Sequence, residues 1–448
     1  MICHRRCKVL LLFVAGQLAA CGGGGGGGIG IGDGGASNGP FAVTVTVSGL
    51  RGTGLELQNM GSDGLSIGGN GASTFATTLA SGSAYSVTVA RAPNGPTQAC
   101  VVANGRGVTT VIGVNNVTVT CRDVTRTAYV VDTPGNAVAW YGAAAGGQLN
   151  AAGNAASGLG ATGMAVDPGG RFAYVTNATG NTVSQFTVAD NGNLVPMPAA
   201  SVLAGLSPAG IAIHPSGSFV YVTNRASNTI SQYAVGASGN LAPLPSAFAV
   251  AGLAPGSMAV SPNGRFAYVT NSAGANVSQF SVGIDGGLQP MATAFVATGN
   301  APAGIAIHPS GRFAYVANSI SNSLSQFAIG PDGNLTPVAA AIASQTTPVA
   351  IAIDGLGRFV YAVNRDSDTV SQYAVAVDGS LVALATATVA TGNLPMSIAA
   401  DPAGAFVYVG NATSANVSQF AISPPGPLLP LAPPAVPATA GLGAIAIR

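Results

Sequence analysis

The stretch GIAIHPSGRFAYVANSISNSLSQFAIGPDGNLTPVAAAIAS, residues Gly304 to Ser344, decides the fold. It holds four apolar runs, which are GIAIHP, FAYVAN, SLSQFAIG and LTPVAAAIAS. Each run has the length of a strand, alternates in polarity or is rich in β-branched residues, and is bounded by turn residues. The stretch therefore predicts four consecutive strands rather than a pair of helices.

The same unit recurs along the chain. A Ser-Gln pair followed by an aromatic residue marks the third strand, and it returns at spacings of 47, 47, 47, 46 and 47 residues. These pairs begin at Ser184, Ser231, Ser278, Ser325, Ser371 and Ser418. Ala139 in AVAWYG fills the same place one period earlier, which makes seven copies. Four strands per unit at a period in the forties are typical of the blades of a β-propeller.

The two ends of the array indicate a closed ring. It begins at TAYVVD (Thr127 to Asp132) without a GIAI strand before it, and it ends with GAIAIR (Gly443 to Arg448) with nothing after it. The last strand therefore supplies the missing inner strand of the first blade, which removes free edges at the seam. We expect an all-β fold in which residues 126–448 form a seven-bladed propeller of four-stranded blades.

The histidines of the array lie in a repeated turn. His214 and His308 precede Pro-Ser-Gly between the first and second strands, and Asp167, Ser261 and Asp401 fill the same place in other units. A short polar side chain, a proline and a glycine are the residues that such turns require. We interpret both histidines as parts of the scaffold rather than as catalytic groups.

Residues 40–125 predict a separate β-sandwich. FAVTVTVSGL, AYSVTVA and NNVTVTC alternate in polarity and are separated by Gly, Asn and Pro clusters, which indicates short strands with one buried face. We expect a small sandwich of the immunoglobulin-like type. Cys100 and Cys121 are expected to form a disulfide worth about 3 kcal/mol in an oxidising compartment. Two free buried thiols are the alternative.

The N-terminus predicts export. A positive segment, Arg5 to Lys8, precedes a short apolar stretch that ends in Leu-Ala-Ala-Cys21. This ending resembles the lipobox of bacterial lipoproteins, in which the cysteine is acylated, so residues 1–21 are expected to be a signal peptide with Cys21 as the lipidated residue. The alternative is an ordinary secretory signal with a chance cysteine. The glycine-rich residues 22–39 are expected to be a flexible linker of roughly 20–25 Å.

The expected location follows from the anchor. Several acyl chains hold a protein durably on a membrane. Gly22, rather than Asp, follows the cysteine. The resemblance to Gram-negative lipoproteins therefore implies the outer membrane, with the protein facing the periplasm or the cell surface. Only 6% of residues are charged and the formal net charge is +1, so we expect no nucleic-acid partner. We also expect a monomer without a cofactor.

The AYVTN and AYVAN strands resemble those of YVTN-repeat and lactonase-type propellers, which include proteins similar to six-phosphogluconolactonase. The resemblance spans about Arg126 to Arg448 and implies the seven-bladed fold. It also implies action on lactones at the central face with acid–base and arginine side chains. Between these residues the chain has no glutamate and no lysine, and its histidines lie in the turn described above. The catalytic residues of the family therefore cannot be carried over.

The candidate ligand residues are charges that break the repeat. The loops between second and third strands share a face with the blade connections, where small ligands bind in propellers. Arg225, Arg365, Asp366, Asp368 and Asp132 interrupt the repeat there. Two arginines across a channel could hold a carboxylate or a phosphate, and the alternative is a set of exposed charges that screen one another. Two aspartates are too few for a calcium site, so we expect no metal.

Two functions remain open from the sequence. The first is a membrane-anchored lipoprotein that presents the propeller for binding a protein, a glycan or a small anionic ligand. The second is a lactonase-like hydrolase or isomerase that acts on a small anionic lactone at the central face. The near-identical units and the missing acid–base residues favour the first.

Overall fold

The computed structural model describes residues 40–61, 63–93, 95, 97–110, 113–423 and 426–448. Within these ranges the regular structure consists of strands and contains no helix. In this part of the chain there is accordingly no helix with the length and apolar character needed to cross a membrane. The predicted all-β class is confirmed.

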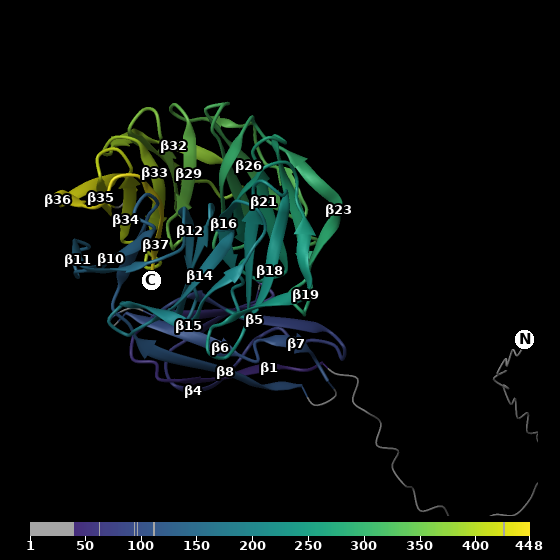
Figure 1. The fold of residues 1–448 in the computed structure, drawn as a ribbon. Helices are drawn as coiled ribbons and strands as arrows, with labels where there is room; N and C mark the ends of the chain where they lie inside the picture. The colour runs from purple at the N-terminus through teal and green to yellow at the C-terminus, as the bar shows by residue number, and fades with distance from the viewer. Residues whose placement is uncertain (1–39, 62, 94, 96, 111–112, 424–425) are drawn as a thin grey trace, which may run out of the picture. The chain divides into compact units, whose positions relative to one another are not determined.

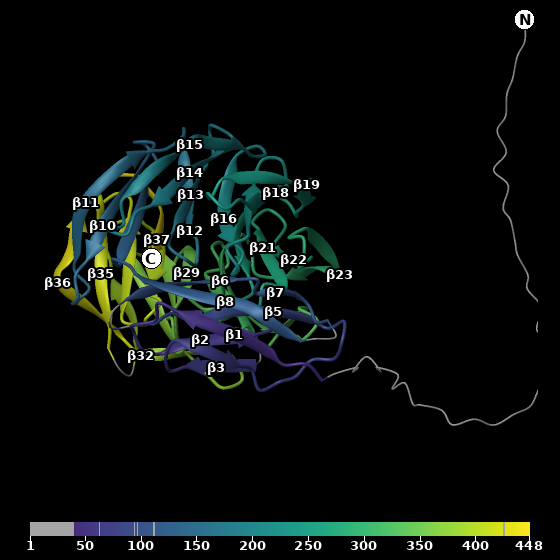
Figure 2. The ribbon, with the colours of Figure 1, turned by 90° about the horizontal axis from the view of Figure 1, so that it is seen from below.

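Seven sheets, one per repeat, stand around a central channel (Figures 1 and 2). From the channel outward, the strands of the first three blades are β37 (Leu442–Ile447), β9 (Thr127–Asp132), β10 (Ala137–Ala143) and β11 (Leu149–Ala156); β12 (Ala161–Val166), β13 (Phe172–Asn177), β14 (Thr182–Val188) and β15 (Leu194–Leu203); and β16 (Pro208–Ile213), β17 (Phe219–Asn224), β18 (Thr229–Val235) and β19 (Leu241–Val250).

The remaining four blades follow the same order. They are β20 (Pro255–Val260), β21 (Phe266–Asn271), β22 (Asn276–Val282) and β23 (Leu288–Ala297); β24 (Pro302–Ile307), β25 (Phe313–Asn318), β26 (Ser323–Ile329), β27 (Leu335–Pro337) and β28 (Ile342–Ala343); β29 (Pro348–Ile353), β30 (Phe359–Asn364), β31 (Thr369–Val375) and β32 (Leu381–Ala390); and β33 (Pro395–Ala400), β34 (Phe406–Asn411), β35 (Asn416–Ile422) and β36 (Leu428–Pro437).

The last strand closes the ring as the sequence predicts. β37 pairs antiparallel with β9, with Ile445 opposite Val130. It also contacts β12 and β33, the inner strands of the two neighbouring blades. In Figure 2 the yellow C-terminal strand lies beside the blue strands of the first blade. The prediction of seven blades with a shared first blade is confirmed.

A ring of tyrosines explains the AYV motif. The central tyrosine of each second strand is fully buried, and its hydroxyl donates to a glycine carbonyl in the turn between the third and fourth strands of the next blade, at 2.6–3.0 Å. The donors are Tyr129, Tyr174, Tyr221, Tyr268, Tyr315, Tyr361 and Tyr408, and the acceptors, in the same order, are Gly192, Gly239, Gly286, Gly333, Gly379, Gly426 and Gly147. The last bond joins the seventh blade to the first. Each blade is thus tied to its neighbour by a bond that the repeat encodes.

The glutamine of the SQF motif forms a second set of links between blades. Gln185 Oε1 accepts the backbone N–H of Leu241 in the next blade at 2.6 Å, and its amide donates to Ala199 of its own blade at 2.8 Å. The ring closes in the same way, because Gln419 accepts the N–H of Leu149 at 2.6 Å. The residues that mark the repeat in the sequence are therefore those that join the blades.

Small residues let the inner strands approach one another. A Cβ atom on Gly210 of β16 would lie 2.3 Å from the carbonyl oxygen of Gly256 on β20. Gly163 of β12 is in the same position against Ala209. At these two positions the closeness of the neighbouring backbone requires glycine, whereas serine or alanine fills the same place in other blades, namely Ser257, Ala350, Ser397 and Ala444.

The fourth strand of the fifth blade differs from the prediction. The run LTPVAAAIAS was expected to form one strand, but it forms two short ones, β27 and β28. This unit is the one with the 46-residue spacing. In the neighbouring blade the fourth strand carries extra residues as a bulge opposite Ser278 and Phe280, and such a bulge consumes chain. The fifth unit is one residue shorter, and the pairing of its fourth strand with β26 is interrupted at this place instead.

The N-terminal part forms a two-sheet sandwich. One sheet has the order β4 (Gly71–Thr74), β1 (Val43–Ser48), β8 (Val114–Asp123) and β6 (Gln98–Ala103), and the other has β3 (Asp63–Ile67), β2 (Leu55–Asn59), β5 (Ala84–Arg91) and β7 (Arg106–Val108). Residues of both sheets, such as Val45, Val119, Leu57 and Val87, share one core. The immunoglobulin-like topology and the exact division at 125/126 stay predictions.

Cys100 and Cys121 form the disulfide that the sequence predicts. They lie opposite each other on β6 and β8, so the bond joins neighbouring strands of one sheet. Both are buried in the sandwich core. The expected signal peptide, the expected lipidation site Cys21 and the expected linker 22–39 lie outside the described residues.

Candidate binding channel

The inner strands enclose a cavity of about 700 Å³ at the centre of the propeller. Its wall contains one Met or Ile from each blade, and these seven residues share one position of the repeat. They are Met164, Ile211, Met258, Ile305, Ile351, Ile398 and Ile445. Among the described residues that line the cavity none is charged. A cavity of this size and character suits a small, largely apolar molecule.

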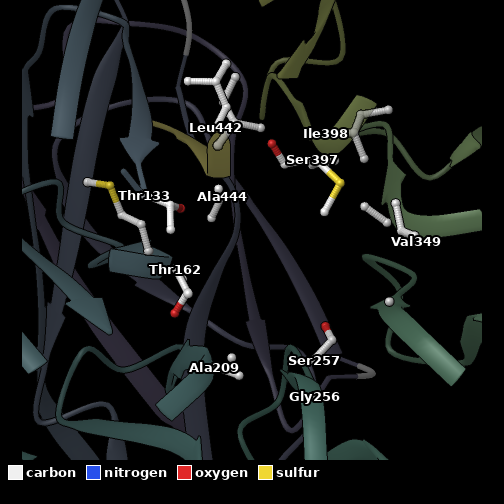
Figure 3. A pocket seen from close by; sticks show the side chains of 18 of the residues that line it. Thr133, Thr162, Ala209, Gly256, Ser257, Val349, Ser397, Ile398, Leu442 and Ala444 are labelled. Carbon is white, nitrogen blue, oxygen red and sulfur yellow. The ribbon is translucent and has the colours of Figure 1, made fainter. Parts of the chain in front are cut away.

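A few hydroxyls interrupt the apolar wall. They belong to Thr133, Thr162, Ser257 and Ser397. Figure 3 shows Thr162 and Val349 on opposite sides of the hollow. The Thr162 hydroxyl lies 2.9 Å from that of Thr176 and donates to the carbonyl of Pro208 at 3.2 Å, so its hydrogen bonds are made within the wall.

The loop face of the propeller opens beside this cavity. In the second to seventh blades, the first residue of the loop between the second and third strands donates its backbone N–H to the connection that leads into the inner strand of the same blade. Arg225 donates to Ser207, Arg365 to Thr347 and Ala412 to Leu394, each at 2.9 Å. Ala412 and Leu394 line the cavity. Because Arg225 and Arg365 occupy the same repeat position as Ala412, their backbones lie at the rim of the channel.

Asparagines at the ends of the second strands hold this rim in place. Asn177 is fully buried, and its amide donates to the hydroxyls of Thr182 and Ser184 at 2.9 and 3.0 Å. Its Oδ1 accepts the N–H of Gly158 in the blade connection at 3.0 Å. Asn177 therefore caps the end of its strand and ties it to the blade connection.

Arg365 is already paired. Its guanidinium donates to both carboxylate oxygens of Asp366, at 2.7 and 3.1 Å. Asp366 also accepts the hydroxyl of Thr347 at 2.6 Å. The hydrogen bonds from Arg365 and then Thr347 lower the pKa of Asp366 to about 2. On this side of the rim the charge of Arg365 is therefore balanced by that of Asp366.

The other two aspartates have local structural partners. Asp368 has a positive φ of 53°, and its Oδ1 accepts the N–H of Leu394 in the blade connection at 2.8 Å. Asp132 is buried, and its Oδ1 accepts the N–H of Gly135 at 2.8 Å. Neither aspartate is among the residues that line the cavity. The five candidates thus form one pair and three separate residues, and their role in ligand binding stays a prediction.

Arg225 differs from every other arginine that the structure describes. Each of the others has an ion pair, a side-chain hydrogen bond or a ring contact, whereas no such interaction joins the Arg225 guanidinium to any described residue. Arg225 is exposed to solvent. The rim therefore carries one cation without a partner among the described residues.

The two histidines belong to the scaffold. His214 Nδ1 accepts the N–H of Ser216 at 3.0 Å, and Nε2 lies 2.8 Å from the carbonyl oxygen of Gly264 in the next blade and 2.8 Å from the Arg106 guanidinium. His308 repeats this arrangement with Ser310 and Gly357. Burial, followed by the charge of Arg106, lowers the pKa of His214 to about 4. Both ring nitrogens are engaged, which confirms the interpretation drawn from the repeat.

No three His, Cys, Asp or Glu side chains come together as metal ligands would within the described ranges. The cavity wall offers thioethers, hydroxyls and backbone instead. The chemistry available at the channel is therefore apolar contact and hydrogen bonding.

The sequence matches the family model described as "Lactonase, 7-bladed beta-propeller" over residues 119–299, 250–382 and 285–432. Together these ranges cover well over half of the chain. The chain belongs to this family. No curated protein matches the sequence.

Solved structures of similar fold cover a large part of the chain. A periplasmic gluconolactonase of Pseudomonas aeruginosa is 20% identical, with a TM-score of 0.60 and coverage of 72% of this chain and 99% of that one. A putative 6-phosphogluconolactonase of Bacteroides uniformis is 18% identical, with a TM-score of 0.64 and coverage of 73% and 100%. One from Bacteroides fragilis is also 18% identical, with a TM-score of 0.63 and coverage of 73% and 98%. At such identities the likeness shows the shared fold.

The charge-based search of the sequence missed the cavity wall. Met164, Ile211 and their equivalents recur with the period of the blades, which was the available signal. In the sequence these residues look like ordinary strand residues. The blade period shows which positions are equivalent, but it does not show which of these positions border the channel.

Proposed function

We propose that this protein is a binding module that takes a small molecule into the central channel of its propeller. The observation that carries the proposal is the cavity of about 700 Å³, whose described lining is apolar apart from a few hydroxyls and contains no charged side chain. General acid–base catalysis needs a titratable group within hydrogen-bond reach of the reacting atoms. A wall of this kind supports binding better than it supports hydrolysis.

Binding of the apolar fluorophore N-phenyl-1-naphthylamine tests the proposal. We expect saturable binding of one molecule per chain, and we expect the variant Val349→Trp to abolish it because the indole would fill the cavity that Val349 lines. The matched control is Val377→Trp, since Val377 is 95% exposed and lies outside the cavity lining. Binding that survives Val349→Trp, or no binding at all, would contradict the proposal.

Lactone hydrolysis is the second candidate function, and the family match favours it. Fold and family alone are a weak warrant for activity. The test is turnover of glucono-δ-lactone by the wild type and by the variants Arg225→Ala and Arg365→Ala. Turnover that is lost in both variants would establish the enzyme, and absence of turnover in the wild type would exclude this substrate.

We further propose that the chain is exported and anchored to the outer membrane through acylated Cys21. The lipobox-like sequence before Cys21 and the glycine-rich residues after it support this proposal. Cell fractionation tests it, because Cys21→Ser should move the protein from the membrane to the soluble fraction. A variant that remains in the membrane fraction would contradict the lipid anchor.

A further inference from the structure

The rim of the channel pairs an unpartnered cation with an apolar interior. Arg225 has no ion pair, side-chain hydrogen bond or ring contact with any described residue. Its counterpart across the rim, Arg365, is neutralised by Asp366 at 2.7 Å. The two arginines that look alike in the sequence therefore differ in charge balance, and one side of the rim keeps an uncompensated positive charge.

The backbone places Arg225 at the rim, beside the strand that lines the cavity. The N–H of Arg225 donates to Ser207, which precedes β16, and Ala209 and Ile211 of β16 line the cavity. Asn224 lies opposite Pro208 in the strand register. Ile211 lies opposite Val222, two residues before Asn224, so at about 3.3 Å per residue it is roughly 7 Å below Pro208 along the channel. An anionic group at Arg225 and a chain reaching Ile211 are thus compatible with one short molecule.

The surface beside Arg225 is apolar as well. Leu206, whose carbonyl accepts the N–H of Ala226, is 57% exposed. The equivalent residues of the two adjoining connections, Leu159 and Leu253, are 62% and 58% exposed. These exposed leucines offer apolar surface on the same side of the rim as Arg225.

We propose that the channel ligand is an anionic amphiphile, with its carboxylate held by the Arg225 guanidinium and its alkyl chain in the cavity. This inference rests on the proposed function, since it assigns the chemical class of the molecule that the channel binds. A guanidinium presents paired donors that match a carboxylate. The methionines of the wall, Met164 and Met258, adapt to a flexible chain because their side chains are unbranched and polarisable.

Dodecanoate and dodecanol test the inference because they share a chain and differ in charge. Binding is measured by displacement of N-phenyl-1-naphthylamine, below the concentrations at which either compound aggregates. The full chain carries Cys21→Ser, so that no acyl group of its own competes. We expect the chain to bind dodecanoate about tenfold more tightly than dodecanol, a difference that corresponds to a charge-assisted hydrogen bond.

The variants Arg225→Gln and Arg225→Lys separate charge from geometry. Arg225→Gln should remove the tenfold preference and leave dodecanol binding unchanged, and Arg225→Lys should keep part of it. The matched control is Arg312→Gln, which makes the same charge change in a turn between first and second strands and removes a contact with Phe313. It should keep the full preference.

The possible failures are distinguishable. If dodecanol and dodecanoate bind equally well to the wild type, or if Arg225→Gln leaves the preference intact, the assignment of Arg225 is wrong while the channel remains a binding site. If neither compound displaces the fluorophore although the fluorophore itself binds in the channel, the assignment of an amphiphile is wrong while the proposed function stands. If the fluorophore does not bind, or if Val349→Trp leaves its binding unchanged, the channel itself is not the site and both proposals fall.

Discussion

Protonation of His214 provides a quantitative test of its place in the scaffold. Burial and the charge of Arg106 lower its pKa from the ordinary 6.5 to about 4. The unfolded chain therefore takes up the proton first as the pH falls. The stability that depends on the neutral ring is complete above pH 6.5 and is lost between 6.5 and about 4. At about 1.4 kcal/mol per pH unit, this gap is worth about 3 kcal/mol.

The measurement is urea unfolding of the wild type and of His214→Gln at pH values above 6.5 and down to about 4. The fluorescence of Trp140, the chain's single tryptophan, reports on the propeller because this residue is buried in β10. The free energy of unfolding should fall more steeply with decreasing pH in the wild type than in the variant. Groups common to both proteins, including His308 with its lowered pKa, cancel in the comparison. Equal slopes would refute the assignment of the neutral, buried ring.

Further predictions concern the joints between blades. Tyr268→Phe should lower the free energy of unfolding by about 1–3 kcal/mol, because it leaves the carbonyl of Gly333 without the buried hydroxyl that now lies 2.6 Å away. Urea unfolding measures it, and an unchanged midpoint would contradict the role of the tyrosine ring. Gly210→Val should destabilise the chain by more than about 2 kcal/mol, because its Cβ would meet the carbonyl of Gly256. The control Gly142→Val, at a strand glycine with no atom near its added Cβ, should cost much less, and equal losses would refute the close-approach explanation.

The sequence predicts the scaffold well because the repeat encodes the contacts between blades. The tyrosine and the glutamine that mark each unit are the donors and acceptors that tie it to the next, as Tyr268 and Gln185 illustrate. A contact made seven times leaves a period that a single sequence reveals. The closure of the ring was predictable for the same reason. The first repeat lacks an inner strand of its own, and β37 supplies it.

The channel was less predictable because its properties depend on details that do not repeat. Arg225 and Arg365 stand at one repeat position and look equivalent in the sequence. They differ because Asp366 follows Arg365 whereas Ala226 follows Arg225, and only the structure shows that this neighbour takes up the charge. Asp368 looked like a ligand-binding residue in the sequence, and in the structure its carboxylate accepts a hydrogen bond from a backbone N–H. A charge that interrupts a repeat is therefore ambiguous until its partners are known.

The most direct test is a crystal structure of the chain grown with dodecanoate. We predict electron density for the alkyl chain inside the ring formed by Met164, Ile305 and their equivalents, with the carboxylate within hydrogen-bond distance of the Arg225 guanidinium. Density for the compound at another place, with the channel filled only by water, would contradict the claim that this propeller binds its ligand in the central channel.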